Sequence, residues 1–239
     1  MKTLGVIGGL GPMATAYFMQ LVTSMTDAAR DQDHLHMIVF SRPDTPDRTG
    51  YILGRIRENP APVMIDSGKK LAALGAERIV VPCNTAHYFH AQMEEEIGVP
   101  IVHMIRETAS YLKERGVQRA GIMATDGTIQ TGLYQQELSK VGIESVVPSK
   151  TGQEAVMHLI YENVKAGRPV EMEYFHAAKE ELQGMGADVC LMACTELSVI
   201  KGDYDLGPGV LDALEVLART AVLQCEAPLR AEYRELITQ

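Results

Sequence analysis

Two cysteines close similar segments of the chain. Gly75-Ala-Glu-Arg-Ile-Val-Val-Pro-Cys83-Asn-Thr aligns with Gly186-Ala-Asp-Val-Cys-Leu-Met-Ala-Cys194-Thr-Glu, and each cysteine lies eight positions after the first glycine. A thiol near its reference pKa of about 8.5 acts as a base when ionised and as an acid when protonated. Inversion of a stereocentre by proton transfer needs a base on one face of the carbon and an acid on the other. A symmetric pair of thiols suits that chemistry.

Polar residues follow both cysteines: Asn84, Thr85, Thr195 and Glu196. In a turn at the end of a strand, hydroxyls, amides and backbone N–H groups can hold a carboxylate. Thr85 and Thr195 are also common residues at the start of a helix, so either one alone fits a structural role. Together with the repeated cysteine they indicate a binding site.

A second match supports an internal duplication. Gly5-Val-Ile-Gly-Gly aligns with Gly121-Ile-Met-Ala-Thr125, each a strand pattern followed by a turn and a helix pattern. Two matches in the same order predict duplicated α/β halves. Ligands of α/β proteins bind at the carboxyl ends of the strands, so we expect Cys83 and Cys194 to meet in one cleft.

The elements that must position these residues follow an α/β pattern. Short apolar runs that end in Gly, Pro, Asn or Thr alternate with longer helical patterns, as is typical of parallel sheets. The expected strands are Leu4–Ile7, Leu35–Phe40, Arg78–Pro82, Ile101–His103, Ala120–Ala124, Ser145–Val147 and Asp188–Ala193. The expected helices are Pro12–Arg30, Pro60–Leu74, Ala86–Ile97, Arg106–Arg115, Ile129–Val141, Gly152–Lys165, Val170–Met185 and Val210–Cys225.

The first turn of the chain raises a competing interpretation. Gly9, Gly11 and Ala14 satisfy G-x-G-x-x-G/A, the pattern of dinucleotide-binding loops. Such a site places an acidic residue at the end of the second strand, where this chain has Phe40-Ser41-Arg42. The loop therefore favours a small carboxylate held near a helix N-terminus, where N–H groups and the helix dipole attract an anion.

Composition limits the class of protein. The chain has 239 residues, a formal net charge of −9 and 46% hydrophobic residues, which is ordinary for a globular protein. The negative charge, without a basic stripe, argues against a nucleic-acid partner. Neither a signal-peptide pattern nor an apolar run of membrane-spanning length is present. We therefore expect a cytoplasmic protein without a membrane partner, whose four cysteines remain thiols.

Other reactive side chains have simpler explanations. Cys190 lies inside an expected strand and Cys225 in an expected helix, where a buried cysteine is usually an inert apolar residue. His87 lies four positions after Cys83, a spacing that metal sites use, but the remaining ligands are not supplied at comparable spacing. We expect a histidine on a helix face near the site and no metal.

Five segments together resemble the signatures of the aspartate/glutamate racemase family, most closely its aspartate branch. They occur in the expected order over nearly the whole chain, and the paired Cys-Asn-Thr and Cys-Thr-Glu motifs are the most specific. The segments are Gly8-Gly-Leu-Gly-Pro-Met-Ala-Thr15, Ser41-Arg-Pro-Asp-Thr-Pro-Asp-Arg48-Thr, Pro82-Cys-Asn-Thr-Ala-His87, Ala124-Thr-Asp-Gly-Thr128 and Ala193-Cys-Thr-Glu196.

The resemblance implies a cofactor-independent racemase of aspartate, glutamate or both. It implies that Cys83 and Cys194 flank the substrate Cα as a thiolate/thiol pair, with Cys194 deprotonating the L-enantiomer and Cys83 the D-enantiomer. It also implies that Arg48 and Lys165 hold the side-chain carboxylate. The other expected substrate-binding residues are Gly11, Met13, Asn84, Thr85, Thr125, Thr128, Thr195 and Glu196.

The resemblance further implies two pseudo-symmetric three-layer α/β domains with mainly parallel sheets and the active site in the cleft between them. We expect residues 1–100 together with 210–239 to form the first domain and 101–209 the second. A homodimer is expected on the same basis. Two other functions stay open: a module that binds a small metabolite without turnover, and a decarboxylase or isomerase of the same superfamily.

Overall fold

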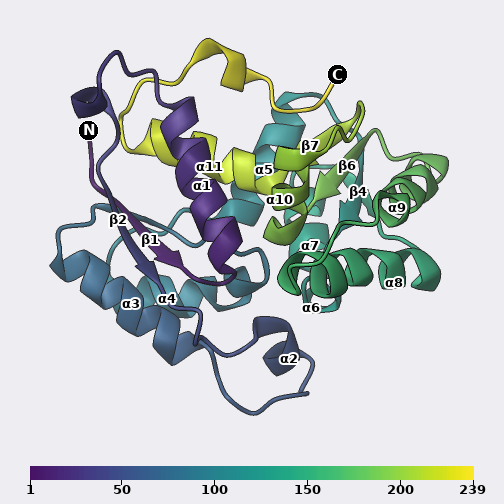
Figure 1. Cartoon of the computed structure of the whole chain (residues 1–239), viewed down its shortest axis with the longest axis horizontal. Helices are drawn as coiled ribbons and strands as arrows, with labels where there is room; N and C mark the ends of the chain where they lie inside the picture. The colour runs from purple at the N-terminus through teal and green to yellow at the C-terminus, as the bar shows by residue number, and fades with distance from the viewer.

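The computed structural model, which describes residues 1–239, contains two parallel sheets (Figure 1). The first has the order β2-β1-β3 and the second the order β5-β4-β6-β7. All strand pairs within them are parallel. The strands are β1 Leu4–Gly8, β2 Met37–Ser41, β3 Arg78–Val80, β4 Arg119–Met123, β5 Glu144–Val146, β6 Val189–Met192 and β7 Val210–Asp212.

Helices cover both faces of each sheet. The α-helices are α1 Pro12–Met25, α2 Arg48–Ile52, α3 Ala61–Ala73, α4 His90–Ile97, α5 Met104–Glu114, α6 Asp126–Thr131, α7 Leu133–Lys140, α8 Lys150–His158, α9 Met172–Gly184, α10 Thr195–Asp203 and α11 Ala213–Gln224. A π-helical segment, Leu159–Lys165, continues α8, and short 3-10 helices occur at Asp31–Asp33, Thr85–Phe89 and Ala231–Arg234.

Alternating side chains of the strands divide the core into layers. In β1, Leu4 and Val6 pack in the largest apolar cluster with α1, α5 and α11, whereas Ile7 packs in a separate cluster with α3 and α4. In β4, Ile122 joins the largest cluster and Met123 joins a third cluster with α8, α9 and α10. The fold is therefore α/β with a three-layer arrangement in each half, as predicted.

Helix α11 joins the two halves. It packs against α1 and α5 and contributes to the one apolar cluster that contains strands of both sheets (Figure 1). This placement explains its composition, because nine of its twelve residues are buried. The two sheets therefore share a central apolar layer.

The two halves repeat one close contact between a strand and a helix. A Cβ atom on Gly5 would lie 3.3 Å from the Cβ of Leu71 in α3, and one on Gly121 would lie 2.9 Å from the Cβ of Leu182 in α9. Each glycine occupies the central strand of its half, so its missing side chain lets a neighbouring segment approach. The structure thus confirms the duplicated architecture that the two sequence matches predicted.

Several expected elements differ from the structure in their bounds, and three differ in type or continuity. The segment expected to be one helix over Val210–Cys225 begins as strand β7. This strand pairs with β6, so residues 210–212 belong to the second sheet and not to the first. The expected strand Ile101–His103 is reduced to a single bridge between Ile79 and Ile101. The helix expected over Ile129–Val141 is interrupted at Gly132, whose φ of 66° is left-handed and ends α6.

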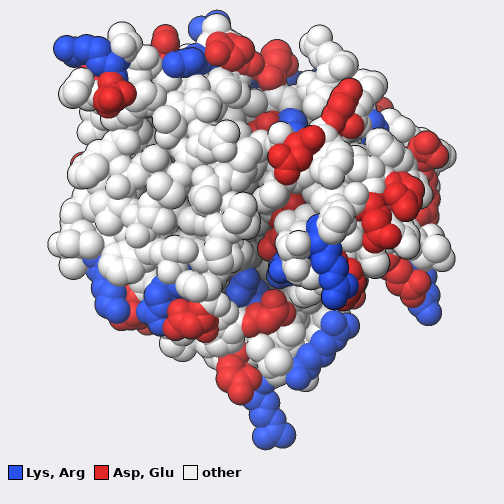
Figure 2. All heavy atoms as spheres, viewed as in Figure 1, with Lys and Arg blue, Asp and Glu red and all other residues white.

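The surface around α1 is unusual in its lack of charge. No charged residue occurs in Pro12–Met25. Figure 2 shows acidic and basic side chains intermixed around this uncharged area, without a basic stripe on the face in view. No helix in the chain combines the length and the apolar composition needed to cross a membrane.

Candidate active site

The two repeated cysteines line one small cavity between the halves. Cys83 follows β3 and Cys194 follows β6, and both are buried, with 6% and 5% of their surface exposed. The space between the lining residues is about 10 Å³, on the order of one water molecule. The lining residues are Leu10, Asp47, Arg48, Thr49, Cys83, Asn84, Thr85, Thr125, Lys165, Cys194, Thr195 and Glu196.

Cys194 lies at the start of a helix beside a carboxylate. It is the N-cap residue of α10, and its Sγ donates a hydrogen bond to Oε2 of Glu196 at 2.9 Å. Burial and the Glu196 charge raise the pKa of the Cys194 thiol well above its usual range, although the nearby Lys165 opposes them. The protonated thiol is therefore the favoured form of Cys194 in this structure.

Arg48 brings a buried cation to the other side of the cavity. It begins α2, where Asp47 is the N-cap residue. Its guanidinium donates to the carbonyl oxygens of Leu10 at 2.8 Å, Pro46 at 3.0 Å and Thr45 at 3.2 Å.

Burial disfavours the Arg48 charge, but the neighbouring Cys83 and Asp47 outweigh it and raise the Arg48 pKa. The cavity thus places a cation beside Cys83 and a carboxylate beside Cys194.

Two buried N–H groups at the cavity have no hydrogen-bond partner. They are Nε of Arg48 and Nδ2 of Asn84. The hydroxyl of the fully buried Tyr134 donates a hydrogen bond to Oδ1 of Asn84 at 2.5 Å, and this bond fixes the orientation of the Asn84 amide. Unpaired buried donors are costly. A carboxylate bound in the cavity would satisfy them.

Four threonine hydroxyls from both halves form a polar cluster next to these donors. Oγ1 of Thr125 lies 3.2 Å from Oγ1 of Thr49 and 3.1 Å from that of Thr85. Oγ1 of Thr128 lies 2.9 Å from that of Thr85. Thr125 also caps α6 by accepting a hydrogen bond from the Thr128 backbone N–H. The cluster joins α2 and the Cys83 turn of the first half to the α6 turn of the second.

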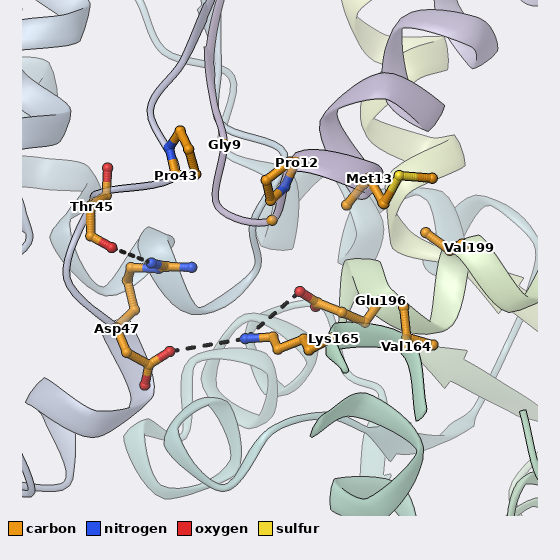
Figure 3. A pocket seen from close by; sticks show the side chains of 13 residues that line it. Gly9, Pro12, Met13, Pro43, Thr45, Asp47, Val164, Lys165, Glu196 and Val199 are labelled. Atoms are coloured by element: carbon orange, nitrogen blue, oxygen red, sulfur yellow. Dashed lines mark hydrogen bonds and ion pairs between the residues drawn. The ribbon is translucent and has the colours of Figure 1, made fainter. Parts of the chain in front are cut away.

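Lys165 lines both this cavity and a second, outer one. Its Nζ lies 3.7 Å from Oε1 of Glu196 and 3.9 Å from Oδ2 of Asp47 (Figure 3). It also lies 4.4 Å from the ring centre of Tyr161. Burial opposes the Lys165 charge, yet Glu196 and the other neighbours raise its pKa above the ordinary value. The side chain is a permanent cation between two carboxylates.

The outer cavity has a volume of about 350 Å³ and lies at the N-terminus of α1 (Figure 3). It shares Asp47, Arg48, Lys165 and Glu196 with the inner cavity. Its other lining residues are Gly9, Gly11, Pro12, Met13, Ala14, Pro43, Thr45, Val164 and Val199.

The structure brings eleven of the twelve expected site residues to these two cavities. Gly11 and Met13 line only the outer cavity, and the fully buried Thr128 lines neither but contacts Thr85. The expectation missed Asp47 and Thr49, although both flank Arg48 within a motif that the sequence had singled out.

Close packing against the backbone requires a glycine at position 9, in the loop between β1 and α1. Gly9 has a left-handed φ of 87°, and a Cβ there would lie 2.3 Å from the backbone nitrogen of Arg42. Its own N–H donates to Oγ1 of Thr15 at 2.8 Å. The loop therefore positions the start of α1 at the rim of the outer cavity.

The remaining reactive side chains are engaged elsewhere. Burial raises the pKa of the Cys190 and Cys225 thiols to about 11. Nε2 of His87 accepts from the backbone N–H of Met104, and Nδ1 lies 2.9 Å from the Cys83 carbonyl. Burial lowers the pKa of His87 to about 4. No group of three or more His, Cys, Asp and Glu side chains is arranged to hold a metal ion.

Two duplicated α/β halves, each presenting a cysteine at the end of an equivalent strand, define the architecture of an amino-acid racemase. The family model of the Asp/Glu/hydantoin racemases matches residues 7–221, and the chain belongs to that family.

Individual relatives agree with this assignment. The chain is 28% identical over 226 residues to the broad specificity amino-acid racemase RacX of Bacillus subtilis, covering 92% of this chain and 96% of that protein. Aspartate racemase from Picrophilus torridus superposes with a TM-score of 0.83 at 32% identity, covering 98% of both chains. Glutamate racemase from Francisella tularensis superposes with a TM-score of 0.64 at 17% identity, covering 94% of this chain and 82% of that one, and shows the common fold.

Proposed function

We propose that this protein racemises aspartate, glutamate or both without a cofactor, using Cys83 and Cys194 as two opposed acid/base groups. The observation that carries the proposal is the position of both thiols in one buried cavity, each at the carboxyl end of an equivalent strand. A base and an acid on opposite faces of Cα are what stereoinversion by proton transfer requires.

The surroundings of the two cysteines differ. Cys194 donates its thiol proton to Glu196, whereas Arg48 brings a cation to the Cys83 side of the cavity. In one direction the Cys83 thiolate takes the Cα proton, while the Cys194 thiol delivers its proton to the opposite face. This leaves Cys83 as thiol and Cys194 as thiolate, which is the starting state for the other enantiomer.

The carbanion that develops at Cα is the main energetic cost. In the proposed complex the α-carboxylate accepts hydrogen bonds from the unpaired N–H groups of Arg48 and Asn84, and the threonine hydroxyls of both halves are further possible donors. Fixed donors in a cavity that excludes water stabilise developing charge more strongly than solvent does. A side-chain carboxylate would then lie toward Lys165.

Proton NMR in D₂O tests this function. The purified protein is mixed with L-aspartate or L-glutamate without cofactor, and the loss of the Cα–H signal is followed by chiral analysis. We expect exchange with inversion for the wild type, and none for Cys83→Ala or Cys194→Ala. Cys190→Ala is the matched control, because Cys190 lies outside the cavity. Full activity in either cavity variant would refute the two-base mechanism.

A further inference from the structure

Asn84 lies directly after Cys83, and its side chain does not cap the helix that follows. It is the N-cap residue of the 3-10 helix Thr85–Phe89, yet its side chain makes no capping hydrogen bond. Oδ1 accepts from the hydroxyl of Tyr134 at 2.5 Å, whereas Nδ2 has no partner in a residue that is only 3% exposed and lines the inner cavity. An unpaired buried donor makes the folded state less stable, so a ligand explains this amide better than stability does.

The Tyr134 hydroxyl decides which end of this amide is left without a partner. The oxygen and the NH₂ group of an asparagine are nearly alike in shape, so hydrogen-bond partners determine how the amide is turned. Tyr134 is fully buried, and burial raises its pKa above the ordinary value. The phenol therefore keeps its proton and donates it to Oδ1. This leaves Nδ2, the donor end of the amide, for a ligand in the cavity.

This hydrogen bond crosses from one half of the molecule to the other. Tyr134 lies in α7, which packs on β5 of the second sheet, and Asn84 follows β3 of the first. The two residues are fifty positions apart in the chain. Tyr134 lines neither cavity. Because its hydroxyl is neutral, it acts on the inner cavity through the amide that it holds.

We propose that Tyr134 is a positioning residue for racemisation: its hydroxyl holds the Asn84 amide so that Nδ2, and not Oδ1, faces the substrate α-carboxylate. This inference rests on the two-base function proposed above and adds a residue to its machinery. Without the hydroxyl, the buried Oδ1 loses its partner and the amide is free to turn its oxygen toward the carboxylate, where two acceptors repel each other. The carboxylate gains negative charge as Cα loses its proton, so the Nδ2 donor matters most in the transition state.

Removal of the hydroxyl alone tests this role. Tyr134→Phe keeps the ring that packs in the core, and the D₂O exchange assay is run with whichever of L-aspartate and L-glutamate the wild type exchanges faster. We expect kcat/KM to fall by about tenfold to a hundredfold, mostly through kcat, because a donor to the developing charge is misplaced. Tyr111→Phe is the matched control. Tyr111 is also buried in the core, but its hydroxyl bonds to the backbone of residues 234 and 236 and it lines neither cavity, so kcat/KM should not change.

A double-mutant cycle separates positioning from a general defect of the core. Asn84→Ala removes the amide, and we expect it to lower kcat/KM by about a hundredfold. Tyr134→Phe made in the Asn84→Ala background should then cause no further loss, because no amide remains to be oriented. The double variant also leaves no buried Oδ1 without its donor, so its free energy of unfolding in urea should be at least that of Tyr134→Phe.

The outcomes distinguish this inference from the function on which it rests. Wild-type kcat/KM in Tyr134→Phe overturns the positioning role and leaves the two-base racemase intact. Equal losses from Tyr134→Phe in the wild-type and Asn84→Ala backgrounds also overturn it, because a loss that does not depend on the amide is structural. Absence of exchange by the wild type with both aspartate and glutamate overturns the proposed function and this inference together.

Discussion

Asp212 anchors the helix that carries Cys194. Its Oδ1 accepts hydrogen bonds from Oγ of Ser198 at 2.7 Å and from the backbone N–H of Leu214 at 2.8 Å, which ties α10 to the start of α11. Asp212 is fully buried, and its Oδ2 has no partner. Burial and the neighbouring Glu215 raise the Asp212 pKa from 3.8 to about 7. We predict that this carboxyl makes the folded state less stable as pH rises.

The sign and size follow from the difference between the folded and unfolded carboxyl. Because the folded pKa is raised, the stability contribution is fully present below about pH 4 and is lost as pH rises toward 7. Between pH 5 and pH 8 the loss is roughly 2 to 3 kcal/mol. The Asp212→Asn variant keeps the oxygen that accepts both hydrogen bonds but does not ionise, so it should escape this loss.

Urea unfolding of wild type and Asp212→Asn at pH 5 and pH 8 measures the effect. The variant should gain about 2 kcal/mol relative to the wild type between the two pH values. Asp203→Asn, the same change at an exposed position of α10, controls for general surface charge. A difference between Asp212→Asn and wild type that is the same at both pH values would refute the reasoning.

Two further predictions concern the Cys194 thiol and the duplicated fold. The Glu196→Gln variant lacks the carboxylate that helps to raise the Cys194 pKa, so iodoacetamide at pH 8 should label Cys194 faster than in the wild type. Mass spectrometry measures the labelling rate, with Cys190 as the internal reference. An unchanged rate would contradict the role of Glu196. Gly121→Ala should lower the free energy of unfolding by about 1 to 3 kcal/mol, because the added Cβ lies 2.9 Å from that of Leu182. Gly184→Ala, whose Cβ would meet nothing within 4 Å, should not lower it, and equal urea midpoints for the two variants would contradict this account.

The sequence was sufficient for the parts of the fold that repeat. Cys83 and Cys194 were found because the same spacing of glycine, acidic residue and cysteine occurs twice, and each such segment forms a strand and its turn. Strand β7 was missed because Val210-Leu211-Asp212 runs directly into the apolar α11 without a break in composition. Asp212 caps α11 through its side chain, and this was the available signal for a later helix start.

Contacts between distant segments account for what the sequence could not provide. Tyr134 orients Asn84 across fifty positions of the chain, and no local pattern connects the two residues. Arg48 and Lys165 were expected to be cations free for a ligand. Only the folded chain places Asp47 near Lys165 and the Leu10 carbonyl near Arg48. Residue types thus indicated where the candidate site lies, while tertiary contacts determine how many donors of each cation remain without a partner.

The duplicated backbone makes the two cysteines equivalent in position, and the residues that follow them make them unequal in chemistry. After Cys83 the chain continues through Asn84 into a 3-10 helix, and the Arg48 cation is a charged neighbour of Cys83. Cys194 begins an α-helix, and Glu196 in the first turn accepts its thiol proton. A helix N-terminus by itself favours a thiolate, so the carboxylate and burial must outweigh that preference at Cys194. The repeated fold therefore places the two thiols at equivalent positions, and the proposed mechanism starts from a Cys194 whose proton is held by burial and Glu196.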